Sequence, residues 1–144
     1  MASLEGCARP GNTVNLSEQD LNANHGYDYA ECAGGNHWMS TAYLARWAGP
    51  LLETDVPYPY GDGAIGSERY HVQNVIWIPE RSGPTDNNTI KEMVMTHGPV
   101  HMSYYHNDAY LSTTGLAFYN NVNTNTNHAV SIIGWDDNYA AANF

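Results

Sequence analysis

Residues 125–139 read NTNHAVSIIGWDDNY and place a single histidine, His128, at the start of an apolar run. The run from Ala129 to Trp135 predicts a strand that is buried on both faces. A ring that can exchange a proton would then lie on a rigid element at the edge of the core. Catalytic groups are often placed this way, because rigid elements hold their geometry better than loops. His128 is therefore the first candidate catalytic residue.

Composition limits the classes of protein to consider. The 144 residues are 42% hydrophobic and 14% charged, which is typical of a folded protein with one sizeable core or two small lobes. The formal net charge of -10 would repel phosphate backbones and anionic lipid heads. The apolar runs are shorter than the ~18 residues that a membrane span needs. We expect no nucleic-acid binding and no membrane insertion.

Residues 1–60 carry helical signals. In NLSEQDL, Ser17 is the expected N-cap of a helix, with Asp20 in the position of a capping box. The segment NHWMSTAYLARWAG (36–49) repeats apolar residues at helical spacing and ends at Gly49 and a proline. The repeated apolar positions, which we expect in the core, are Trp38, Tyr43, Leu44 and Trp47. The segment DVPYPYGDG that follows predicts a connector in extended or turn conformation.

Residues 61–144 are richer in strand signals. Asn87 or Asn88 can cap a short helix through TIKEMVMT, which ends at Gly98 and Pro99. Strands are predicted on either side of that helix, in the segments YHVQNVIWIPE (70–80), VHMSYYH (100–106), GLAFYN (115–120) and HAVSIIGW (128–135). A helical half followed by a strand-rich half predicts an α+β fold with two segregated lobes, 1–60 and 61–144.

The order of motifs resembles the papain-like cysteine peptidases, in particular their bacterial branch. The motifs that carry the resemblance are NLSEQDL, CAGGN before a tryptophan-bearing helix, DVPYPY, IKEMVMTHGPV and NHAVSIIGW. Each motif is weak alone, but five of them follow the family's order from Leu4 to Tyr139. The resemblance implies a helical lobe followed by an antiparallel, β-barrel-like lobe, here incomplete. It also implies peptide-bond hydrolysis, with peptides or proteins as partners and without a cofactor.

The resemblance assigns roles to particular residues. His128 matches the histidine that forms a pair with a cysteine thiol, keeps it reactive as a thiolate and protonates the leaving amine. Gly34 and Gly35 match paired glycines whose backbone runs beside an extended substrate peptide. The remaining residues matched to substrate binding are Asn36, His37, Trp38, Val100 and Asn127.

The expected nucleophile is not found. The family signature places its histidine roughly 130–150 residues after the catalytic cysteine, so the matching position lies before Met1. The orienting asparagine of the family is also not found after His128. We therefore expect a fragment that is truncated at both ends and inactive alone.

Neither cysteine of the chain is expected to replace the nucleophile. Cys7 lies at the far end of the helix that would carry it, and Cys32 matches a structural cysteine. A disulfide between the two is left open, because the sequence cannot fix a pairing.

Metal binding is a weaker hypothesis. His97, His101 and His106 lie close together in sequence, but the glycine and proline after His97 break any helix that would align them. The acidic turn WDDN has oxygen ligands without the glycine and glutamate of a calcium loop. We expect no metal site.

Two other functions stay open beside the peptidase. The chain is a non-catalytic, peptide-binding module if it is complete as given. A carbohydrate-binding module is suggested only by the tyrosine, tryptophan and asparagine content. The abundance of Asn, Thr, Tyr and Gly also favours a secreted or cell-envelope protein.

Overall fold

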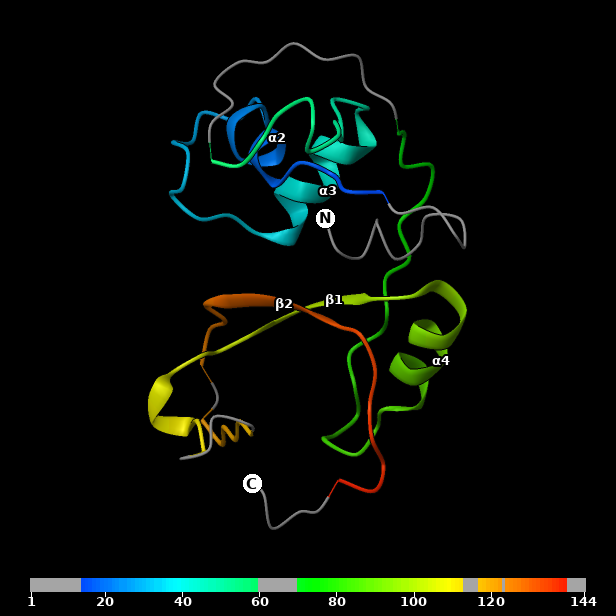
Figure 1. Cartoon of the computed structure of the whole chain (residues 1–144). Helices are drawn as coiled ribbons and strands as arrows, with labels where there is room; N and C mark the ends of the chain where they lie inside the picture. The colour runs from blue at the N-terminus through cyan, green and yellow to red at the C-terminus, as the bar shows by residue number, and fades with distance from the viewer. Residues whose placement is uncertain (1–13, 60–69, 113–116, 123, 140–144) are drawn as a thin grey trace. The chain divides into compact units, whose positions relative to one another are not determined.

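The computed structural model describes residues 14–59, 70–112, 117–122 and 124–139. Its elements follow the chain in the order α2 (Glu18–Ala23), α3 (His37–Ala45), α4 (Asn88–His97), β1 (Val100–Tyr104), the 3₁₀ turn η1 (Asp108–Tyr110) and β2 (His128–Ile132) (Figure 1). The described residues up to Pro79 form one compact unit, and those from Glu80 form a second. Among the described residues, the regular elements of the first unit are helices, whereas the second unit combines a helix and a sheet, so the predicted α+β class is confirmed.

The start of α2 follows the predicted capping signal. The Ser17 hydroxyl accepts a hydrogen bond from the backbone N–H of Asp20 at 2.9 Å and donates one to the Val56 carbonyl at 2.5 Å. An isolated antiparallel bridge joins Leu16 to Leu52 beside it. Ser17 therefore connects α2 to the start of the connector, and it is fully buried.

The core of the first unit is small and contains a buried carboxylate. Its hydrophobic members are Leu16, Tyr43, Leu51 and Val56. Asp20 lies among them, where it accepts hydrogen bonds from the Tyr43 hydroxyl, the Leu51 N–H at 3.1 Å and the Asn24 amide at 2.8 Å. These three donors replace the water that the carboxylate loses on burial.

Helix α3 begins and ends close to the predicted positions, but its aromatic side chains do not all form the core. Tyr43 is fully buried, whereas Trp38 is 62% exposed and Trp47 is 52% exposed. The Trp47 indole instead stacks on His71 with ring centroids 4.4 Å apart, and its N–H donates to the Val72 carbonyl. The expectation that all of these aromatics are core residues was wrong, because a nine-residue helix packs only one stripe of its surface and Trp47 lies beyond the end of the helix.

The strand predicted over 70–80 is not present. These residues have no regular secondary structure, and Ile76 and Trp77 are about half exposed. Alternation of apolar and polar residues creates a strand only where a neighbouring strand accepts its backbone hydrogen bonds. Among the described residues no strand pairs with this segment.

Helix α4 has the predicted position, but its first turn lacks the expected side-chain capping bond. Asn87 is its N-cap residue, but its side chain makes no capping hydrogen bond to the helix. The Asn87 amide instead accepts from Arg81 at 2.7 Å and donates to the Pro84 carbonyl. The helix ends where Gly98 takes φ 90°, a conformation that favours glycine.

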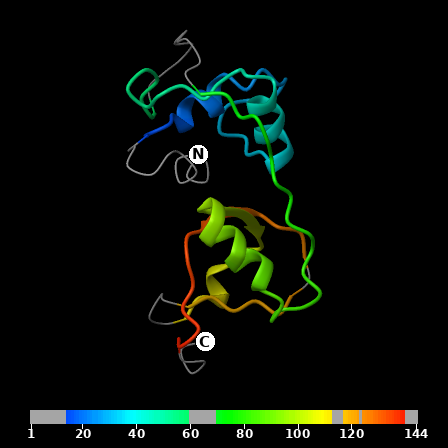
Figure 2. The ribbon, with the colours of Figure 1, turned by 90° about the vertical axis from the view of Figure 1, so that its right-hand side faces the viewer.

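Strands β1 and β2 pair in antiparallel register, from Val100 opposite Ile132 to Tyr104 opposite His128, and α4 contacts β1 (Figure 2). The sheet described has two strands and is not closed into a barrel. Of the predicted segment 115–120, the first two residues lie outside the described part. The remainder forms one isolated bridge, between Leu111 and Phe118, rather than a strand.

The prediction that β2 is buried on both faces was wrong. His128 and Ala129 are exposed, and beyond the strand Ile133 is 80% exposed. A strand is covered on both faces only when other elements lie over each of them, and the described sheet has α4 as its one packed helix. No helix among the described residues has the length and apolar character to cross a membrane.

Candidate active site

His128 is the first residue of β2, at the end of the two-stranded ladder. Its partner in the register is Tyr104, and the backbone N–H of the preceding Asn127 donates to the Tyr104 carbonyl at 3.1 Å. The imidazole is exposed, so a substrate could reach it. The strand therefore fixes the backbone of His128 and leaves its side chain accessible.

Two aromatic rings contact the His128 imidazole. The Tyr104 ring lies edge-on to it, with centroids 5.4 Å apart at 84°, and the His106 ring lies 5.4 Å away at 43°. Both contacts come from the segment that ends β1. No hydrogen bond between the His128 ring and another described residue is found.

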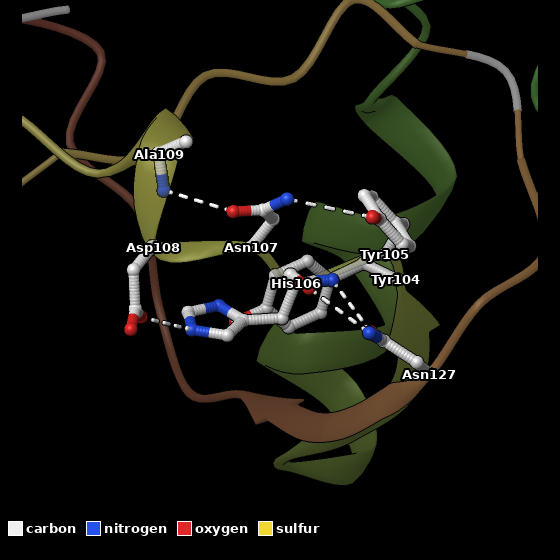
Figure 3. Close-up of polar contacts among 7 residues, drawn as sticks. All are labelled: Tyr104, Tyr105, His106, Asn107, Asp108, Ala109 and Asn127. Atoms are coloured by element: carbon white, nitrogen blue, oxygen red, sulfur yellow. Dashed lines mark hydrogen bonds and ion pairs between the residues drawn. The ribbon is translucent and has the colours of Figure 1, made fainter.

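Asn127 joins this segment to β2. Its side-chain oxygen accepts from the His106 backbone N–H at 2.6 Å, and its amide donates to the His106 carbonyl at 2.9 Å (Figure 3). The two bonds satisfy both backbone polar groups of His106. The residue matched to substrate binding thus uses its side chain to hold a neighbouring loop.

The His106 ring has partners at both nitrogens. Its Nδ1 lies 3.1 Å from the Tyr104 hydroxyl, and its Nε2 lies 3.1 Å from the carboxylate of Asp108 (Figure 3). The ring also stacks on Phe118, with an interplanar angle of 19°. Sequence reasoning considered His106 only as a metal ligand. The signal that was missed is the alternation Tyr104, His106, Asp108, which in extended backbone points side chains to the same side.

The other predicted substrate-binding residues form a continuous stretch of the first unit. Gly34 and Gly35 are exposed, and Gly34 has φ 96°. A Cβ atom on Gly34 would meet nothing within 4 Å, and one on Gly35 would meet only the Met39 sulfur at 3.9 Å. The backbone surface at the two glycines is therefore open.

Asn36, His37 and Trp38 lead from the glycines into α3. The Asn36 side chain caps the helix by accepting from the N–H groups of Trp38 at 3.0 Å and Met39 at 3.1 Å. Trp38 and Trp77 lie with ring centroids 4.6 Å apart, and His37 contacts both. An exposed aromatic cluster thus stands next to the open glycine backbone.

Val100 lies in the second unit with His128 and Asn127, at the opposite end of the β1–β2 ladder. It is partly exposed. The structure thus brings the predicted site residues into two groups, one in each unit.

The described cysteine is Cys32, which is free and exposed and has φ 58°. Asn22 holds it through a hydrogen bond to the Cys32 N–H at 2.9 Å and a longer contact to the sulfur. Cys7 lies outside the described residues. Within the described part of the chain, no three His, Cys, Asp or Glu side chains are grouped to hold a metal ion.

The sequence profile of the papain family cysteine proteases matches residues 2–143. This chain belongs to the papain family of cysteine proteases. A viral cathepsin of the Cydia pomonella granulosis virus (isolate Mexico/1963) is 29% identical over 137 residues, which cover 85% of this chain and 36% of the viral protein. The predicted family is thereby confirmed.

Solved structures of the papain family also match this chain. The clostridial cysteine protease Cwp84 after propeptide cleavage has a TM-score of 0.75 at 30% identity, covering all of this chain and 39% of the other. A structure of the cysteine protease and lectin-like domains of Cwp84 from Clostridium difficile gives 0.74 at 30%, covering all of this chain and 34% of the other. The papain-like fold is confirmed, and this papain-family chain spans between a third and two fifths of the relatives' length.

Proposed function

We propose that this chain provides the histidine and part of the substrate-binding surface of a papain-family cysteine peptidase. The observation that carries the proposal is the position of His128, exposed at the entrance of β2 within a chain that matches the family over residues 2–143. His128 holds the nucleophilic thiol as a thiolate and then donates a proton to the leaving amine.

The substrate in this proposal is an extended peptide. Gly34 and Gly35 support it, because their open backbone lets a peptide main chain approach and pair with it. Asn36, His37 and Trp38 follow directly and contact the side chain beside the scissile bond, with Val100 as a further contact. Asn127 contributes through the loop that it holds.

Neither Cys7 nor Cys32 is the nucleophile in this proposal. Cys32 lies two residues before Gly34, and its backbone is held there by Asn22. The isolated 144-residue chain is therefore expected to show no thiol-dependent proteolysis. The site of action is outside the cytoplasm or in the cell envelope, which the likeness to a surface-layer-associated protease supports.

The first experiment compares two preparations. The protein from its natural source is analysed by intact mass and N-terminal sequencing and then tested, beside the 144-residue chain, on a fluorogenic peptide. We expect thiol-dependent hydrolysis by the natural protein only, and a loss of at least about 10²-fold in its His128→Ala variant, the lower range for a proton-transfer group.

Three results would contradict parts of the proposal. Undiminished hydrolysis by His128→Ala would remove the catalytic role of that residue. Hydrolysis by the isolated chain that stops on thiol alkylation would mean that Cys7 or Cys32 is the nucleophile. Peptide binding without any hydrolysis by the natural protein would favour a binding module.

A further inference from the structure

We propose that His106 is a positioning residue that holds the imidazole of His128 in one orientation. The inference rests on the proposed role of His128 in proton transfer, because only then does its orientation matter for a reaction. The two histidine rings are in contact, with centroids 5.4 Å apart.

The His106 ring is itself held in one orientation. A carboxylate can only accept, so Nε2 of His106 donates to Asp108, and Nδ1 then accepts from the Tyr104 hydroxyl. A neutral imidazole satisfies both bonds in this single tautomer. Flipping the ring would exchange the two nitrogens with carbon atoms and break both bonds.

The contacts of His106 differ in strength. The Asp108 carboxylate is 94% exposed, so water competes with the ring nitrogen for it and the bond contributes little. Tyr104, which is half-buried, and the stacked Phe118 are better shielded. We therefore assign the ring orientation mainly to Tyr104 and Phe118, and the backbone position to the two bonds from Asn127.

The wall formed by Tyr104 and His106 limits the rotamers of His128. Tyr104 meets the His128 ring edge-on at 5.4 Å, and His106 covers a second side. Among the described residues, these two ring contacts are the ones that restrain the imidazole, and no hydrogen bond to its nitrogens is found. Truncating His106 would open one side and let the ring move between staggered rotamers.

Side-chain NMR of the isotope-labelled 144-residue chain tests the geometry without depending on activity. In the wild-type chain we expect one χ1 rotamer for His128 and nuclear Overhauser contacts from its ring to Tyr104 and His106. His106→Ala should give averaged χ1 couplings and lose the contacts to Tyr104. His106→Phe keeps a ring against Phe118 and should retain most of the ordering.

Two control variants sharpen the comparison. Asp108→Asn should change the His128 couplings little, because that partner is exposed. His97→Ala removes an exposed histidine from the last residue of α4 and should leave His128 as in the wild type. A His106→Ala chain that keeps its backbone NMR spectrum and also keeps one His128 rotamer would overturn the proposal.

Kinetics of the natural protein separate positioning from binding. His106→Ala should lower kcat by about 10- to 10²-fold with KM nearly unchanged, the size expected for a misplaced catalytic group. His106→Phe should recover part of the rate. A change in KM alone would overturn the positioning role, whereas hydrolysis that survives His128→Ala would refute the proposed function and leave the NMR result standing.

Discussion

The hydroxyl of Tyr43 donates a hydrogen bond to the carboxylate of Asp20, and both side chains are buried in the first unit. The bond joins α3 to α2, 23 residues apart in sequence. The same carboxylate oxygen also accepts from the Leu51 N–H, so one atom connects both helices to the segment that follows them.

Asp20→Ala is expected to destabilise the chain strongly. It removes the hydrogen bond from the Tyr43 hydroxyl and takes the acceptor from the buried Leu51 N–H, at a cost of about 1–3 kcal/mol for an unsatisfied buried group. Urea denaturation should show the loss in the free energy of unfolding. Asp28→Ala is the matched control, because Asp28 is exposed in the same unit, and it should stay within about 0.5 kcal/mol of wild type.

Gly49→Ala is expected to disrupt the same contact. An added Cβ would overlap the Tyr43 hydroxyl and lie 2.6 Å from Asp20 Oδ2. The hydrogen bond would have to break or the turn to shift, with a loss of about 1–3 kcal/mol, typical of overpacking. In thermal unfolding, Gly35→Ala should leave the transition almost unchanged, since its Cβ has room. Equal midpoint temperatures for Gly49→Ala and Gly35→Ala would mean that the turn at Gly49 shifts without loss of stability.

The helix caps Ser17 and Asn36 should contribute differently to the free energy of unfolding. Asn36→Ala removes a side chain that accepts from two N–H groups at an exposed helix start, with an expected loss of about 1 kcal/mol. Ser17→Ala removes a cap and also a buried bond to the Val56 carbonyl, so its loss should be larger by about 1 kcal/mol or more. Chemical denaturation of both variants gives the order, and the reverse order would contradict the role of Ser17 in tertiary packing.

The two glycines beside α3 separate folding from substrate contact. Gly34→Ala places a side chain at φ 96° and should cost about 1 kcal/mol of stability. Gly35→Ala should cost almost none and still weaken peptide binding, because its methyl group stands on the proposed substrate surface. Peptide titration followed by NMR checks the second effect, and unchanged binding would remove Gly35 from the site.

Acid should release the contact between Lys91 and Asp137. The hydrogen bond from the Lys91 ammonium holds the pKa of the Asp137 carboxyl below its ordinary value of 3.8. A carboxyl with a lowered folded-state pKa stabilises the fold in its ionised form, so the contribution is complete above 3.8 and disappears as the pH falls through the lowered pKa. NMR titration of the carboxyl carbon should show the midpoint move upward in Lys91→Met.

Asp86 is the internal control for that titration. Its pKa is lowered by the Ser82 N–H and then by the Ser82 hydroxyl, so Lys91→Met should leave its midpoint unchanged. A midpoint of Asp137 that does not respond to Lys91→Met would mean that the ammonium is not its dominant partner.

Local signals in the sequence predicted the starts and ends of several elements. Ser17 stands before a helix because its side chain accepts from a first-turn N–H group, and Gly98 ends α4 because it adopts a positive φ at little cost. Such preferences act within a few residues. Strands in VHMSYYH and HAVSIIGW were predicted from their residue patterns, without their pairing, and the five motifs were enough to indicate the family.

Only the tertiary structure decided burial and side-chain partners. The segment 70–80 has strand-like alternation but no neighbouring strand, and Trp38 and Trp47 have core-like side chains but face outward. The contact between His106 and His128 arises because the pairing of β1 with β2 places Tyr104 opposite His128, 24 positions later in the chain. Sequence alone determined which residue types were available and where helices could start. Which side chains come into contact depends on how distant segments pack together, and a local sequence pattern does not carry that information.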